Sequence, residues 1–257
     1  MEFVIVPLVA LLASGLTLFS GFGLGTLLLP AFALFFPVEV AVGMTAVVHL
    51  LNNLFKLALL GRHADRRVVV AFGAPAAAAA LAGAALLGWL MRLPSLGAWS
   101  AGGRTFEVTP VGAAVGALML GFAALELSPR FDALAFGPRW MPVGGVLSGF
   151  LGGLSGHQGA LRAAFLVRAG LGREGFIATG VACACLVDAT RLSVYAGLAR
   201  HEGVAANAGL VATAALAAFA GALVGARLVR AVTLRGVRLT VGAMLAAIGA
   251  GVASGAL

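Results

Sequence analysis

The sequence predicts an all-α polytopic membrane protein, built from two inverted repeats of about five helical segments each, some of them short or broken. Composition is the first reason: 61% of the 257 residues are hydrophobic and only 10% are charged, whereas soluble domains carry about 25% charged residues. Apolar segments also follow one another along the whole chain, and arginines gather in alternate linkers between them. The net charge of +8 therefore indicates linkers that anchor the protein in a lipid bilayer, and no nucleic-acid partner is expected.

The expected apolar segments cover residues 3–20, 24–36, 38–60, 68–91, 110–127, 141–154, 157–171, 174–198, 204–229 and 239–256. A helix needs about 20 residues to cross a bilayer. Segments 24–36, 141–154 and 157–171 are shorter, so they are expected to be half-helices, re-entrant hairpins or helices tilted in thin bilayer. Only the linkers 92–109 and 128–140 are long, and neither leaves room for a soluble domain.

An internal duplication is predicted from matched residues in the two halves. The matches are Asn53 and Lys56 with Asp188 and Arg191, Ala31-Phe32 with Ala164-Phe165, and Arg62-His63 with Arg200-His201. Each match is weak alone, but all occur in the same order. We therefore expect a first transmembrane repeat at 1–127, a cytoplasmic linker at 128–140 and a second repeat at 141–257.

The distribution of arginines predicts the orientation. Odd-numbered linkers hold Arg62, Arg66, Arg67, Arg130, Arg139, Arg168, Arg173, Arg227, Arg230, Arg235 and Arg238, whereas even-numbered linkers hold only Arg92, Arg104 and Arg200. Positive residues favour the cytoplasm, so the odd linkers are placed there and both termini outside. An odd number of segments per half gives the halves opposite orientations, as in many secondary transporters. The expected location is the bacterial cytoplasmic (inner) membrane, crossed several times.

The stretch from Gly153 to Arg162 combines glycines with polar residues inside apolar surroundings. Ser155, His157, Gln158 and Arg162 are costly in hydrocarbon, so they are expected to face a cavity or other protein groups. The glycines break the helix, and a broken helix offers unpaired N–H groups that favour anions. A purely structural role stays open for Arg162, and for His157 as a hydrogen-bonded packing residue.

A second group of polar residues shares one helical face. His49, Asn52, Asn53 and Lys56 recur at helical spacing in an apolar segment, and Asp188 and Arg191 lie one turn apart in the other half. Such a face is expected to look inward. Three alternatives remain: Asp188 and Arg191 neutralise each other, Lys56 extends to the interface, or the polar residues only join helices. Asp188 is expected to be the only acid buried in a segment.

Glycines four residues apart predict close helix contacts. They are Gly145, Gly149 and Gly153, then Gly112 and Gly116, and Gly221 and Gly225. The spacing fits packing within one chain and also a homodimer. Cys183 and Cys185 lie two apart in an apolar helix and are expected to be small packing residues rather than metal ligands.

Two motifs carry a family resemblance. Gly21-Phe22-Gly23-Leu24-Gly25, followed by Pro30, Gly43-Met44-Thr45-Ala46 and Asn53…Lys56, resembles the first repeat of the sulfite exporter TauE/SafE family. The stretch 152–162 resembles the second motif, although Arg162 and Ala163 stand near the usual proline. The resemblance covers nearly the whole chain. It implies a permease that exports or takes up small sulfur-containing anions such as sulfite or sulfonates.

The expected function is therefore secondary transport of a small anion by alternating access, coupled to protons, without a cofactor and without enzymatic activity. The alternatives are a membrane scaffold without flux and a membrane-embedded enzyme. The candidate substrate-binding residues are Arg162, Arg191, Lys56, His157, Gln158, Ser155, Asn53, Asn52, His49 and Asp188.

Overall fold

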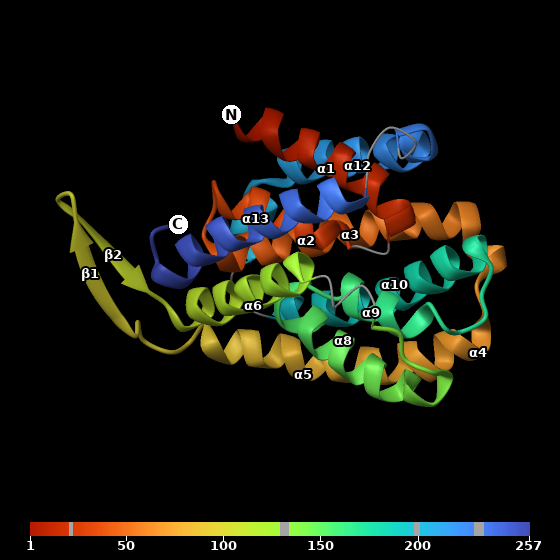
Figure 1. The fold of residues 1–257 in the computed structure, drawn as a ribbon. Helices are drawn as coiled ribbons and strands as arrows, with labels where there is room; N and C mark the ends of the chain where they lie inside the picture. Colours follow the sequence, from red (N-terminus) through yellow and green to blue (C-terminus); the bar gives the residue numbers. More distant parts are fainter. Residues whose placement is uncertain (21–22, 129–133, 198–200, 229–233) are drawn as a thin grey trace.

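The computed structural model describes residues 1–20, 23–128, 134–197, 201–228 and 234–257, and helices dominate it (Figure 1). In the first half they are α1 (Glu2–Ser20), α2 (Leu24–Ala33), α3 (Val38–Leu60), α4 (Arg66–Val68), α5 (Ala74–Leu90) and α6 (Pro110–Leu127). In the second half they are α8 (Met141–Ser155), α9 (Gly159–Leu166), α10 (Arg173–Gly197), α11 (His201–Ala206), α12 (Ala208–Leu228) and α13 (Leu234–Ser254). Short 3-10 turns occupy Gly61–His63 and Pro138–Trp140, and a π-helical turn at Val69–Gly73 joins α4 to α5.

The predicted segments are confirmed, including the short ones. Within the described ranges, five helical stretches are long and apolar enough to cross a membrane: Val38–His63, Arg66–Leu90, Pro110–Leu127, Arg173–Ala196 and Ala208–Gly225. By contrast, α2 has 10 residues and α9 has 8, too few to span a bilayer alone.

The ends of several helices follow from local chemistry. At α6 the side chain of Thr109 accepts a hydrogen bond from the Gly112 N–H, and Pro110 occupies the first turn, where its missing N–H costs nothing. Helix α8 ends because Gly156 takes the left-handed conformation, with φ 85°, which glycine tolerates. These signals explain why the sequence locates the helix ends well.

Three helix pairs form the frame of the molecule (Figure 1): α1 packs on α12, α5 packs on α8, and α6 packs on α13. Helices α3 and α10 lie against each other between them. The glycines four residues apart make these contacts close, because a Cβ on any of them would touch the backbone of the neighbouring helix. Gly145, Gly149 and Gly153 of α8 face the carbonyls of Phe72, Ala76 and Ala80; Gly112 and Gly116 of α6 face Val252 and Gly249 of α13; Gly221 and Gly225 of α12 face Leu11 and Gly15 of α1. The predicted close packing is thus confirmed, and it occurs within one chain.

We expect Gly149→Ala to lower the melting temperature in detergent by about 5–10 °C, from a cost of about 1–3 kcal/mol. The added methyl group would collide with the backbone of Ala76, so α5 and α8 would have to separate. Gly121→Ala in α6 is the matched control, because a Cβ there meets nothing within 4 Å. Equal melting temperatures for the two variants would contradict this reading of the glycines.

A β-hairpin was not predicted, and it corrects the all-α assignment in one place. Strands β1 (Gly97–Ala101) and β2 (Arg104–Val108) pair antiparallel within the expected linker 92–109. Gly102 and Gly103 form the turn with φ 58° and 77°. Trp99 pairs with Phe106 across the strands, with ring centroids 4.7 Å apart, and its Nε1 donates to the Ser254 carbonyl at 2.7 Å. The hairpin projects beyond the helices and is tied to the end of α13 (Figure 1).

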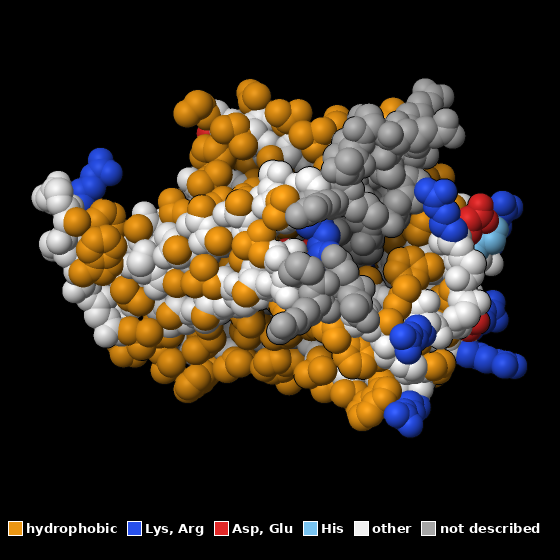
Figure 2. Space-filling view, viewed as in Figure 1, with side chains coloured by type: hydrophobic (Ala, Val, Ile, Leu, Met, Phe, Trp, Pro, Cys, Tyr) orange, Lys and Arg blue, Asp and Glu red, His pale blue; other side chains and the backbone are white. Residues whose placement is uncertain are grey.

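The surface separates apolar sides from charged ends. Figure 2 shows hydrophobic side chains over most of the visible flank, while most of the visible lysine and arginine atoms gather at the end that carries α4, opposite the hairpin. Large apolar residues exposed on the outer helices include Leu81, Trp89, Leu147, Leu216 and Leu223. A continuous apolar flank of this kind fits contact with lipid.

Candidate functional site

Two interrupted helices meet at the centre of the protein. Gly23 precedes α2 in an extended conformation, and residues 156–158 separate α8 from α9. A Cβ at Gly23 would lie 3.5 Å from the backbone of Gly159, and one at Gly25 would lie 3.2 Å from the Gly156 carbonyl. The predicted contact between the two glycine breaks is therefore confirmed for Gly23 and Gly25, whereas Gly21 and Phe22 lie outside the described residues. Their depth in the bilayer, and a cavity between them, stay predictions.

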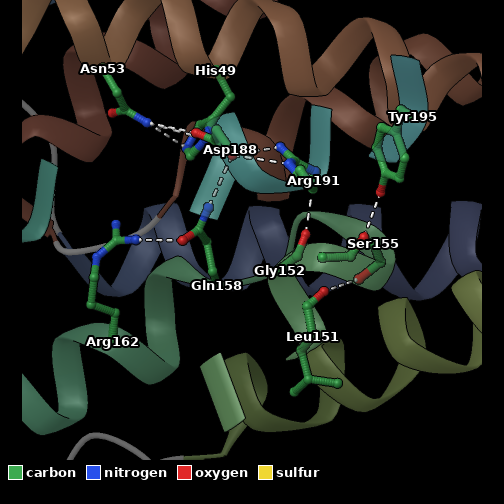
Figure 3. A network of polar contacts seen from close by, with 11 residues as sticks. His49, Asn53, Leu151, Gly152, Ser155, Gln158, Arg162, Asp188, Arg191 and Tyr195 are labelled. Carbon is green, nitrogen blue, oxygen red and sulfur yellow. Dashed lines mark hydrogen bonds and ion pairs between the residues drawn. The ribbon is translucent and has the colours of Figure 1, made fainter. Parts of the chain in front are cut away.

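The carboxylate of Asp188 on α10 is the centre of a polar network beside these breaks (Figure 3). His49 Nδ1 lies 2.6 Å from Oδ2, and the Asn53 amide donates to the same oxygen at 3.3 Å. The Gln158 amide donates to Oδ1 at 3.2 Å, and Arg191 Nε donates to Oδ1 at 3.0 Å. Four side chains from α3, α10 and the second break thus converge on one buried acid. We call Asp188 and these four residues the Asp188 network.

Arg191 is held as the ionic partner of Asp188. Its Nη2 lies 2.9 Å from Asp188 Oδ1, and both side chains are 0% exposed. Its Nη1 donates to the Gly152 carbonyl of α8 at 3.4 Å. This pairing favours the alternative in which Arg191 and Asp188 neutralise each other, and Nη2 is buried without a hydrogen-bond partner among the described residues.

Arg162 on α9 is placed differently. Its Nη1 donates to the side-chain Oε1 of Gln158 at 3.0 Å, and its Nε lies near Gly180 of α10. Among the described residues, no carboxylate lies within 4.0 Å of its guanidinium. Gln158 therefore bridges two charges, since its amide donates to Asp188 while its oxygen accepts from Arg162. Arg162 is a half-buried cation next to a helix break.

Ser155, the last residue of α8, and His157, in the second break, are not bonded to Asp188. Ser155 Oγ donates to the Leu151 carbonyl at 3.1 Å, so its oxygen accepts from His157 Nδ1 at 3.0 Å. The His157 ring stacks on Phe122 of α6, with centroids 5.1 Å apart, and its Nε2 is buried without a partner. His157 thus has the packing partners of the structural alternative and one acceptor nitrogen left over.

The model of the sulfite exporter TauE/SafE family matches residues 6–252. This chain belongs to the sulfite exporter TauE/SafE family. Among curated proteins there is no match to the chain. TauE/SafE members are membrane permeases, which agrees with the five apolar helices long enough to span a membrane.

In this TauE/SafE protein the polar face of α3 divides into two parts. His49 and Asn53 face Asp188, whereas Lys56 and Asn52 face α1 and α12. Lys56 Nζ donates to the Ser14 carbonyl at 3.5 Å. With its amide oriented to satisfy its neighbours, Asn52 accepts from Lys56 at 3.1 Å and donates to the Ala218 carbonyl at 3.3 Å. Because Lys56 is 5% exposed, the alternative that it extends to the membrane interface is wrong.

The sequence missed several groups around this TauE/SafE site. Ser14 contacts Asn52 and accepts from Lys56, and Ser148 Oγ donates to the Gln158 backbone carbonyl at 2.9 Å. A lone hydroxyl in an apolar helix is the signal that identifies such residues. The expectation that Asp188 is the only buried acid is also wrong, because Glu126 on α6 is buried and pairs with Arg238 of α13 at 3.2 Å.

Proposed function

We propose that this protein is a secondary transporter that moves a small anion, sulfite or an organosulfonate, across the bacterial cytoplasmic membrane by alternating access and in company with a proton. Membership of the TauE/SafE family supports permease activity. The observation that supports an anionic substrate is the position of Arg162. This cation has no carboxylate partner among the described residues, and it lies beside two helix breaks that contact each other. Backbone N–H groups at helix N-termini and a guanidinium both favour anions.

The ten candidate residues take different roles in this proposal. Arg162 binds the anion, while Gln158 and the start of α9 orient it. His49, Asn53, Asp188 and Arg191 form the polar wall next to it. Ser155 and His157 shape the second break. Asn52 and Lys56 hold α3 against α1 and α12.

Equivalent contacts in the two halves support an inverted duplication at 1–127 and 141–257, joined by a cytoplasmic linker at 128–140. Exchanging the halves turns the α1–α12 pair into the α8–α5 pair and leaves α3–α10 and α6–α13 unchanged. The matched cations follow the same exchange: Lys56 donates to a carbonyl of α1, and Arg191 donates to a carbonyl of α8. The matched Asn53 and Asp188 bond to each other. Such symmetry suits alternating access.

We expect a cysteine at Arg66 to react from the cytoplasmic side and a cysteine at Arg104 from the outside. The first lies at the end with most of the visible positive charge, and the second lies on the hairpin at the opposite end (Figures 1 and 2). The measurement uses an impermeant thiol reagent on whole cells and on inverted vesicles, with Cys183 and Cys185 replaced by alanine. Labelling of both positions from one side would contradict the proposed topology.

The function is tested by flux into proteoliposomes. We expect uptake of radiolabelled sulfite or a small sulfonate above the level of protein-free liposomes. Sulfate, thiosulfate, sulfoacetate and simple carboxylates complete the screen. Folded protein that carries none of these anions would contradict the proposal and favour a scaffold role, whereas chemical turnover of the anion would favour an enzyme.

A further inference from the structure

We propose that His49, held by Asp188, binds the proton that travels with the anion. This inference rests on the proposed function, because it names the coupling ion's site in that transporter. His49 comes from α3 and Asp188 from α10, the two matched helices of the proposed repeats. A proton site between them would lie where the two halves meet.

The geometry suits a shared proton. His49 Nδ1 and Asp188 Oδ2 are 2.6 Å apart, and both side chains are buried. That is short for a bond between a ring nitrogen and a carboxylate oxygen, as expected when a charged group takes part. A carboxylate beside Nδ1 fixes the tautomer and leaves Nε2 as the nitrogen that gains or loses the proton.

Asp188 itself is poorly placed to carry the proton. Asn53, Gln158 and Arg191 all present N–H groups to its two oxygens. Three donors together with His49 fill the accepting capacity of an ionised carboxylate, and a protonated acid would turn one oxygen into a competing donor. Nε2 of His49, by contrast, has a single polar neighbour within hydrogen-bond distance in the described part of the chain, the Asn53 amide nitrogen at 3.4 Å.

The ionisable groups around His49 set its charge balance. Asp188 and Arg191 face it from α10, and Arg162 acts on it from α9. On its own helix, Lys56 is turned toward α1 and bonded to Ser14. No ionisable residue occurs in α2, and in α12 only Arg227 does, whose side chain lies outside the described set. Since Asp188 and Arg191 cancel, Arg162 leaves one positive charge for an anion, and a proton on His49 adds a second.

Gln158 would connect the two ions. It donates to Asp188 and accepts from Arg162, so an anion that draws Arg162 away also frees the amide that holds Asp188. Anion and proton then bind with positive coupling, because each offsets the charge of the other. The proton arrives from water on one side, converts neutral His49 to imidazolium, and leaves to the other side after the conformational change. No other bond is made or broken.

The test compares two kinds of flux in proteoliposomes carrying the His49→Asn variant. Asn keeps an N–H near the position of Nδ1 but takes up no proton. We expect exchange of radiolabelled sulfite at equal pH to fall, because His49 lies in the polar wall beside the anion, but to stay clearly above the level of protein-free liposomes. We expect accumulation driven by a pH difference to fall to the level of protein-free liposomes. His63→Asn is the matched control, because His63 pairs with Glu174 at 3.1 Å in a partly exposed turn, and both fluxes should persist.

Each remaining result would count against the inference. If the His49→Asn variant accumulates as much sulfite as the unaltered protein, another residue binds the proton, and Lys56 is the next candidate. Loss of exchange together with accumulation would make His49 an anion-binding or structural residue. If the unaltered protein exchanges sulfite but a pH difference drives no accumulation, the protein is a transporter that is not coupled to protons. Absence of flux for every anion would contradict the proposed function instead.

Discussion

Replacement of Arg162 by glutamine is expected to reduce sulfite flux to the level of protein-free liposomes while the protein still folds. Arg162 is half-buried beside the break before α9 and is bonded to Gln158 rather than to an acid. The guanidinium is proposed to donate two hydrogen bonds to the anion. Each hydrogen bond to a charged group contributes about 1.5–3 kcal/mol, so losing both lowers flux by at least about 100-fold. The measurement is initial flux together with the yield of monodisperse protein.

Lysine at the same position separates charge from shape. Arg162→Lys keeps the positive charge but loses the planar fork that fits an oxyanion at two points. Flux should therefore lie between those of the glutamine variant and the unaltered protein, at equal folded yield. Full flux by a well-folded Arg162→Gln protein would show that Arg162 does not bind the anion and has a structural role.

Much of the fold was predictable because local rules determine it. The break before α9 follows from Gly156 and Gly159, and the start of α6 follows from Thr109 and Pro110. The hairpin was missed although Gly102 and Gly103 are a turn signal. Its strands have 5 residues each, and so short an alternation is weak evidence beside the strong hydropathy of the helices.

The candidate residues were predictable as a set, but their partners were not. Helical spacing places His49, Asn53 and Lys56 on one face, yet it does not tell which neighbouring helix each residue meets. In the structure Asn53 bonds Asp188 on α10, whereas Lys56 bonds Ser14 on α1. Those contacts depend on how α1, α3 and α10 pack, which no single-helix pattern contains. Burial of Lys56 likewise depends on α1 covering it.

Asp188→Asn is expected to cause the largest loss of folded protein. Arg191 is 0% exposed and would lose the carboxylate that pairs with it at 2.9 Å. Removing one member of a buried ion pair costs about 3–5 kcal/mol, a large share of a typical stability of about 5–15 kcal/mol. The measurement is the fraction of monodisperse protein after extraction, with the melting temperature of what remains.

Two further variants separate charge burial from transport. Glu126→Gln breaks the ion pair between Glu126 and Arg238. Because the Arg238 side chain is 12% exposed, the loss of folded protein should be smaller than that caused by Asp188→Asn. Asp188→Asn combined with Arg191→Gln removes both charges, and it should restore most of the folded yield because no uncompensated charge stays buried. Flux should be absent in the double variant, since Gln158 loses the acceptor that positions it beside Arg162. An Asp188→Asn protein that melts like the unaltered one would show that Arg191 finds another partner and that the Asp188 network does not hold α3, α9 and α10 together.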